Sequence, residues 1–172
     1  MGFFKRIRSA FGKDQEPALK PRTLVNLKVG DIVSYELIDY QVEGVTLYLG
    51  GTQQRYGYLL NDAGNRRFLL VESKETIRAF LYENIQARLE NPEAVNYEMV
   101  YDGVHYYEKV RGESKVDVIG KSAFHTSDLV YWWMHLSDDG RGMLIEWQNG
   151  ETIIRVGAPI KAEHVTIFAA SE

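Results

Sequence analysis

From residue 24 onward, hydrophobic and polar residues alternate with a period of two, which is the spacing of side chains on β-strands. The pattern starts with Val33, Tyr35 and Leu37, and its phase slips at Gly44, which predicts a β-bulge there. Further segments of this kind cover residues 56–61, 66–73, 100–110, 114–120, 129–136, 142–147, 151–157 and 164–169. Turns rich in Asp, Asn and Gly separate them. About ten short strands predict an all-β fold, an antiparallel sandwich or barrel.

One segment, residues 76–88, fits two structures. Ile77, Leu81 and Ile85 recur at the spacing of a helix face, whereas Ile77, Ala79 and Leu81 alternate as they would on a strand. The periodicity leans toward a helix and the surrounding strands lean toward β, so both interpretations stay open at this point.

Residues 56–73 and 132–148 resemble each other in sequence; we refer to this internal similarity as the echo and to the two ranges as the echo segments. Both segments carry an aromatic residue, a leucine, an aspartate, a glycine and an apolar run that ends in glutamate. The matched pairs are Leu60 and Leu136, Asp62 and Asp138, Gly64 and Gly140, and Glu72 and Glu146. The echo predicts two β-hairpins. It arises either from a duplication that makes two β halves related by a pseudo-twofold axis, or from turn chemistry that recurs in unrelated hairpins.

The N-terminal residues have the pattern of a helix that lies in a membrane interface. On a helical wheel, residues 1–12 gather large apolar side chains within an arc of about 100° and place cations around the rest. The expected membrane-binding residues are Phe3, Phe4, Ile7 and Phe11, with the cations Lys5, Arg6, Arg8 and Lys13. Residues 13–23 form a predicted linker and residues 24–172 the β domain. An anionic membrane is the favoured target of this helix, and a partner protein or its own domain are the alternatives.

Composition and charge narrow the class of protein. The 172 residues are 45% hydrophobic and 26% charged, as in an ordinary globular protein, and no run of 18 apolar residues predicts a membrane-spanning helix. With zero cysteines, disulfides, thiolate zinc sites and a cysteine nucleophile are excluded. The net charge of −4 divides into +4 over residues 1–22 and −8 over the rest. This acidic body argues against binding to nucleic acid.

Few residues have the arrangement of a catalytic or metal site. The four histidines lack the spacing of metal ligands, and the chain has no phosphate-binding loop and no nucleophile elbow. We therefore expect no catalytic residue, no metal and no cofactor. Glu72 and Glu146 are the exception, because a pseudo-twofold axis could bring them together as an acid/base pair. Both follow apolar strand residues near a hairpin rim, so we expect them to be solvated and too far apart to act together.

An aromatic cluster marks a possible interaction surface, made of Tyr131, Trp132, Trp133 and Trp147. Adjacent strand residues point in opposite directions, so Trp132 and Trp133 cannot share one face. In an open sheet with one wet face, one of the two tryptophans would be exposed and available to a partner. In a sandwich or barrel whose strands are covered on both faces, both would be buried. The sequence leaves these two outcomes open.

A series of short motifs runs along the β domain. They are Leu27-x-Val29-Gly30-Asp31, Tyr40-x-Val42-x-Gly44, Tyr58-x-Leu60, Phe68-Leu69-x-Val71-Glu72, Asp102-Gly103-x-x-Tyr106, Leu144-x-Glu146 and Gly157-x-x-Ile160. In this order, over roughly residues 24–168, they resemble domain-of-unknown-function family 4178. That family is bacterial, has no assigned activity, and its genes often lie near phage-shock-like membrane-stress proteins and polyamine-synthesis enzymes. The resemblance implies an envelope-linked accessory role and favours a strand over residues 76–88.

These observations together predict a non-enzymatic adaptor that is peripheral on the cytoplasmic face of the membrane, in a bacterial envelope or membrane-stress response. Its expected partners are an anionic membrane surface and a protein, for which a phage-shock-like membrane protein is one candidate. The alternative is a β domain that binds a small ligand or a cationic partner in a central cleft. An acid/base enzyme that uses Glu72 and Glu146 ranks third.

Overall fold

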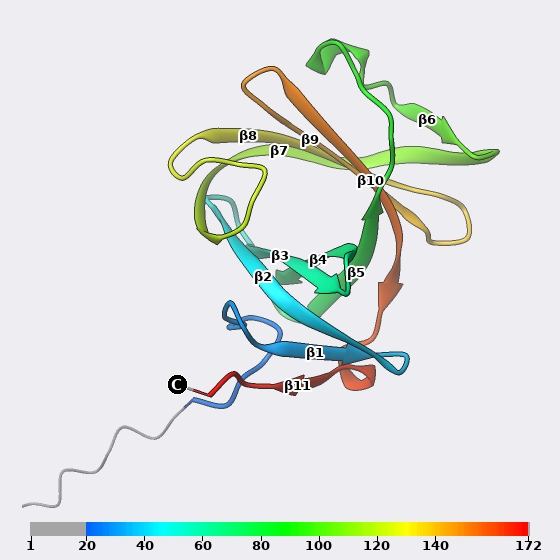
Figure 1. Ribbon diagram of the computed structural model, residues 1–172. Helices are drawn as coiled ribbons and strands as arrows, with labels where there is room; N and C mark the ends of the chain where they lie inside the picture. The colour runs from blue at the N-terminus through cyan, green and yellow to red at the C-terminus, as the bar shows by residue number, and fades with distance from the viewer. Residues whose placement is uncertain (1–19, 172) are drawn as a thin grey trace, which may run out of the picture.

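The computed structural model describes residues 20–171, and nearly all of its elements are β-strands (Figure 1). The strands are β1 (Ile32–Tyr35), β2 (Ile38–Leu49), β3 (Gln54–Asp62), β4 (Asn65–Ser73), β5 (Ile77–Asn84), β6 (Glu98–Tyr101), β7 (Val104–Gly120), β8 (Leu129–Leu136), β9 (Gly142–Gln148), β10 (Glu151–Ile160) and β11 (Thr166–Phe168). Two 3₁₀ turns, Pro92–Ala94 and Ala162–His164, complete the described range. The all-β prediction is confirmed, and no helix within residues 20–171 is long and apolar enough to cross a membrane.

Eight of the strands close into an antiparallel barrel. They follow one another in the order β2-β3-β4-β5-β10-β9-β8-β7, and pairing of β2 with β7 closes the ring. In this closing pair Tyr48 lies opposite Val116. Strands β1 and β11 extend the sheet beside β2, and β6 extends it beside β7, so that Figure 1 shows these short strands outside the ring. Of the two predicted architectures, the barrel is the one formed.

The ambiguous segment forms a strand and an irregular tail. Strand β5 pairs with β4 on one side and β10 on the other, with Tyr82 opposite both Phe68 and Gly157. Because two neighbours hydrogen-bond its backbone, the strand spacing prevails over the helical stripe. The helical interpretation of this segment is therefore wrong. The residues after β5, including Ile85, leave the barrel wall and pack on its outer face.

The predicted bulge at Gly44 is present. The register of β2 against β3 shifts between Val42 and Gly44. At this bulge the end of β7 passes directly over the glycine. A Cβ atom on Gly44 would lie 1.7 Å from the carbonyl oxygen of Lys121, so that only glycine allows this crossing of two backbones.

The two halves of the barrel have the same topology. The first half is a five-stranded meander, β1 to β5, and the second is another, β6 to β10. The first hairpin turn of each half has the same backbone conformation. Glu36 and Leu37, between β1 and β2, have positive φ, and so do the equivalent Asp102 and Gly103 between β6 and β7. The seams join equivalent strands in antiparallel fashion, β2 with β7 and β5 with β10, as a twofold axis requires. Both echo segments form hairpins, β3–β4 and β8–β9, as predicted.

Side chains pack on both faces of the barrel wall. One hydrophobic cluster fills the interior, and each half carries another on its outside. Leu24 and Leu27, with β1 and β11, cover the outer face of the first half. In the second half, Val95 and Ile85 from the segment before β6 do the same. The segment that precedes each meander therefore covers that half, which extends the resemblance between the halves beyond the strands.

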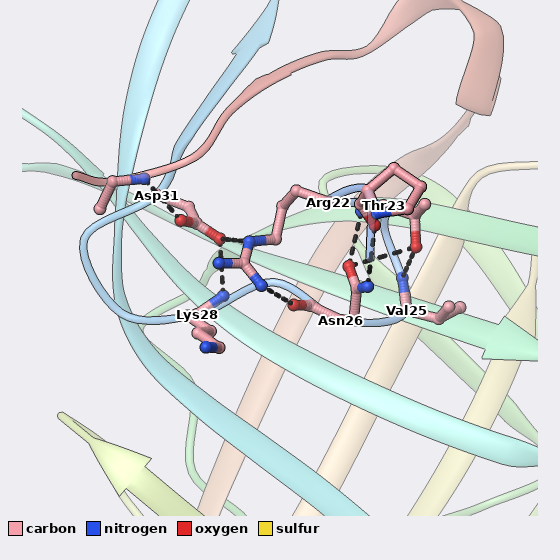
Figure 2. A network of polar contacts seen from close by, with 8 residues as sticks. Arg22, Thr23, Val25, Asn26, Lys28 and Asp31 are labelled. Atoms are coloured by element: carbon pink, nitrogen blue, oxygen red, sulfur yellow. Dashed lines mark hydrogen bonds and ion pairs between the residues drawn. The ribbon is translucent and has the colours of Figure 1, made fainter. Parts of the chain in front are cut away.

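A buried carboxylate, that of Asp31, anchors the segment that covers the first half (Figure 2). Asp31 has no exposed surface and accepts hydrogen bonds from the backbone N–H groups of Lys28, at 2.8 Å, and Ala170, at 2.9 Å. The Arg22 Nε atom lies 2.8 Å from its Oδ2 atom. The preceding Gly30 has a φ of +96°, which turns the chain toward these donors. Asp31 thus holds together segments from both ends of the described chain.

The last residues of the predicted linker, 20–23, are part of the described structure. Residues 1–19 and 172 lie outside the described residues, and with them the predicted helix over residues 1–12 and most of the linker. The end of that linker already folds with the domain. The Thr23 N–H group donates to Oδ1 of Asn26 at 2.6 Å, and Arg22 reaches Asp31.

Candidate functional site

Four charged side chains are buried in the barrel wall where its residues face inward. They are Arg55 of β3, Glu72 of β4, Glu146 of β9 and Arg155 of β10, each at most 5% exposed. The expectation that Glu72 and Glu146 are solvated is therefore wrong. They end apolar runs, but barrel closure turns the face that carries them away from water. The two cations and two anions balance one another, as buried charges must to be tolerated.

Glu146 of β9 is held by Arg155 on the neighbouring strand β10 and by Tyr48 on β2, which does not adjoin β9. The Arg155 Nη1 group donates to its Oε1 atom, and the Tyr48 hydroxyl donates to Oε2 at 2.6 Å. Arg155 also lies flat over the ring of Phe68, with its Cζ atom 3.9 Å from the ring centroid. Burial, reinforced by the Glu146 carboxylate, raises the pKa of the Tyr48 hydroxyl well above its ordinary range. The tyrosine therefore stays protonated and donates to Glu146 at any physiological pH.

Glu72 has a separate set of partners. Gln53 Nε2 donates to its Oε2 atom at 2.5 Å, and Arg78 Nη2 approaches the same atom at 3.5 Å. The guanidinium group of Arg55 lies 3.7 Å above the Trp132 ring and 5.0 Å from the centroid of Tyr48. These stacked contacts hold Arg55 in the interior by cation–π attraction. Each predicted carboxylate is thus engaged by its own group of side chains.

A cavity of about 300 Å³ opens at the barrel end where β5 and β7 finish. Its walls are largely apolar, formed by Leu59, Phe68, Phe124 and Ile153. The β7–β8 connection contributes Phe124, which is buried among the interior side chains. The cavity therefore lies in the barrel mouth between the wall and this connection.

The cavity is also lined by uncharged and charged polar side chains, among them Arg155 and Asn84 and the hydroxyl residues Thr46 and Ser122. Arg155 Nε donates to the Asn84 Oδ1 atom at 3.0 Å, while its Nη1 group is taken by Glu146. Within residues 20–171 the hydrogen bonds of Arg155 are made by Nε and Nη1, which leaves its second amino group, Nη2, without a partner there. Because Oδ1 of Asn84 is occupied, that side chain has its amino group left to offer. Arg155 and Asn84 are thereby fixed as donors.

Two further cations stand at the rim of the cavity. Lys121 Nζ lies 3.0 Å from Glu43 Oε1, and Arg66 Nε lies 3.8 Å from Glu43 Oε2. The hydrogen bond from Lys121 lowers the pKa of Glu43. One carboxylate thus faces two cations, which leaves the rim with a surplus of positive charge.

The predicted aromatic surface is divided by the barrel wall. Trp132 is 8% exposed and lies in the interior, while Trp133 is 6% exposed and packs in the outer cluster of the second half. Both faces are covered, so the alternative with an exposed tryptophan does not hold. Tyr131 is 40% exposed and Trp147 is partly buried. Only a remnant of the expected surface therefore faces solvent.

The histidine on β8 is a structural one. His135 is fully buried, and its Nε2 atom lies 2.9 Å from the backbone oxygen of Asn96. Burial lowers its pKa, so it is neutral at physiological pH. Within residues 20–171 no group of three or more acidic or histidine side chains is placed to hold a metal ion.

A ligand-binding cleft was the alternative prediction from the sequence, but the residues that line this cavity were not predicted, although one signal pointed to them. Arg155 interrupts the apolar run of β10 between Ile154 and Val156. A charged residue inside an otherwise apolar strand needs a buried partner. Glu146 on the adjoining strand β9 supplies that partner.

The fold and site define a closed, eight-stranded antiparallel barrel with buried charges in its interior and a cavity at one mouth. The chain belongs to the family described as Domain of unknown function (DUF4178), whose model matches residues 28–162. The match runs from the Asp31 turn through β10, and it confirms the family resemblance seen in the motifs. Comparison with curated proteins and with solved structures found no match.

Proposed function

We propose that this protein is a non-enzymatic binding protein that takes a small ligand in its barrel mouth. The cavity carries the proposal, because it combines apolar walls with a few fixed polar groups, the usual composition of a small-molecule site. The interior carboxylates support the non-enzymatic part. Glu146 is paired with the Arg155 cation and accepts a hydrogen bond from Tyr48, whereas a general base is held available to take a proton.

The cavity is expected to bind the neutral fluorescent probe N-phenyl-1-naphthylamine, whose emission rises in apolar surroundings. Leu59→Trp should weaken this binding at least about tenfold, because the larger side chain would occupy the volume that the probe needs. The matched control is Leu49→Trp, on an exposed residue of β2 that does not line the cavity. Fluorescence titration measures the effect. A wild-type protein without probe binding, or a Leu59→Trp variant with unchanged binding, would contradict the cavity as the site.

Action at the cytoplasmic face of a bacterial membrane is the second part of the proposal. It is favoured by the apolar arc and the cations of residues 1–12, and by the charge contrast between residues 1–22 and the acidic remainder. A binding barrel on such an anchor would act as an adaptor between the membrane and a protein partner, in envelope or membrane stress.

The membrane part predicts that the full chain sediments with anionic liposomes. Replacing Phe4 and Phe11 together by Ala should lower the partition coefficient at least tenfold, because each buried phenyl group contributes about 1.5–3 kcal/mol. Liposome sedimentation checks this result.

The electrostatic control for this prediction is the pair of substitutions Arg6→Glu and Arg8→Glu. They should weaken binding to anionic liposomes more than binding to neutral ones, and raising the salt concentration should have the same effect. Sedimentation that is unchanged by the two phenylalanine substitutions would exclude the arm as the anchor.

A further inference from the structure

We infer that the ligand of the barrel-mouth cavity is a small amphipathic anion, with a carboxylate or phosphate group at one end and an apolar group at the other. This inference rests on the proposed binding function, and it adds the chemical class of the ligand. Three features of the cavity carry it: the direction of its hydrogen bonds, the sign of its charges and the nature of its walls.

The nitrogen groups of the cavity are donors. Within residues 20–171 the Arg155 Nη2 group has no hydrogen-bond partner, and the Asn84 amide oxygen accepts from Arg155 Nε while its amino group stays available. The cations Lys121 and Arg66 have donors only. The Ser122 hydroxyl accepts from the Phe124 N–H group at 3.0 Å, which leaves its proton to donate. A ligand that satisfies these groups has to supply acceptor oxygens.

The charges around the cavity have one sign. Arg66, Lys121 and Arg155 line it, and among residues 20–171 no acidic side chain does so. Glu146 balances Arg155 from within the wall and Glu43 balances one of the two rim cations, so one positive charge stays uncompensated. The chain outside residues 1–22 is acidic overall. A cation-lined cavity on an acidic body concentrates anions at this end of the barrel and not over the rest of the surface.

The walls favour an apolar group beside the anionic one. Leu59, Phe68, Phe124 and Ile153 form most of the surface opposite the donors. The volume of about 300 Å³ lies at the lower limit for small-molecule sites, so it suits a small ligand such as a short alkyl chain or a compact aromatic group. Inorganic phosphate would leave this apolar surface uncovered, and a neutral alcohol would leave the donors without a charged partner.

The test compares three probes that share an eight-carbon chain: octanoate, octyl phosphate and octanol. Each is titrated against the N-phenyl-1-naphthylamine complex of the full chain, with displacement followed by fluorescence. At least one anion is expected to bind about tenfold or more tightly than octanol, as charge-assisted hydrogen bonds require. The stronger of the two anions identifies a carboxylate or a phosphate ligand.

The structure provides a matched pair of variants for the same titration. Arg66 and Arg67 are neighbours on β4, but Arg66 lines the cavity whereas Arg67 faces the other side and lies 3.6 Å from Glu83. Arg66→Met should weaken binding of the anion about two- to fivefold, as for a solvent-exposed ion pair, and Arg67→Met should leave it unchanged.

The outcomes separate the inference from the function on which it rests. Octanol that binds as tightly as both anions would overturn the inference while the binding function stands. The same conclusion holds if neither anion displaces the probe, or if Arg66→Met and Arg67→Met have equal effects. A wild-type protein that does not bind the neutral probe at all would overturn the binding function instead.

Discussion

Replacing Arg155 by methionine is expected to lower the free energy of unfolding by about 3–5 kcal/mol. Glu146 has no exposed surface, and Arg155 is the cation that faces it. Of the partners of Glu146 within residues 20–171, the substitution leaves the Tyr48 hydroxyl, and burial of an uncompensated charge dominates the cost. The guanidinium group also loses its stacked position over Phe68. Urea denaturation followed by far-UV circular dichroism measures the change.

The double variant Glu146→Gln with Arg155→Met is the control for this prediction. It removes both charges while it keeps a hydrogen-bond acceptor for Tyr48, so much of the lost stability should return. A loss below about 1 kcal/mol for Arg155→Met alone would show that the pair contributes little, as exposed ion pairs do.

Substitution of Asp31 by alanine should also destabilise the fold, by about 3–5 kcal/mol. It leaves the N–H groups of Lys28 and Ala170 without an acceptor, at about 1–3 kcal/mol each when buried, and it removes the partner of Arg22. The exposed Asp39 on β2 gives a matched control, for which Ala is expected to change stability by less than about 0.5 kcal/mol.

Amide hydrogen exchange gives the Asp31 prediction a local measurement. The Ala170 amide should exchange faster in Asp31→Ala, because its hydrogen bond to the Asp31 Oδ1 atom is lost. If Asp31→Ala were as stable as Asp39→Ala, or if Ala170 remained protected, the network in Figure 2 would not tie the two ends of the domain together.

Local chemistry explains which parts of the fold the sequence could predict. Strand periodicity, turn residues and the slip at Gly44 are properties of neighbouring residues, and all appear in the structure. The echo between residues 56–73 and 132–148 likewise predicted two hairpins that formed. The choice between sandwich and barrel lay beyond local reasoning. It depends on the pairing of β2 with β7, in which Tyr48 lies opposite Val116, and these residues are far apart in the sequence.

The candidate site was harder to predict for a related reason. Alternation along a strand separates two faces but does not say which of them meets water. Glu72 and Glu146 were therefore expected at a wet rim, and they lie in the interior. The exposure of Trp132 and Trp133 could not be predicted for the same reason. Both are buried because the interior cluster covers one face of the wall and the outer cluster of the second half covers the other. Arg155 was the residue whose sequence context, a cation among apolar neighbours, signalled an interior partner.

During synthesis at the ribosome, the strands of the first half emerge before the strands with which they pair at the two seams of the barrel. On the sides that face away from the first meander, β5 pairs with β10 and the second part of β2 pairs with β7. The first meander therefore emerges from the ribosome with both of these edges unpaired. Exposed edges are templates for pairing with other chains. The nascent first half is thus open to misassembly until the second half follows. Ring closure joins strands far apart in sequence, and pairing of such distant segments is slow because the entropy of closing the long loop is lost first.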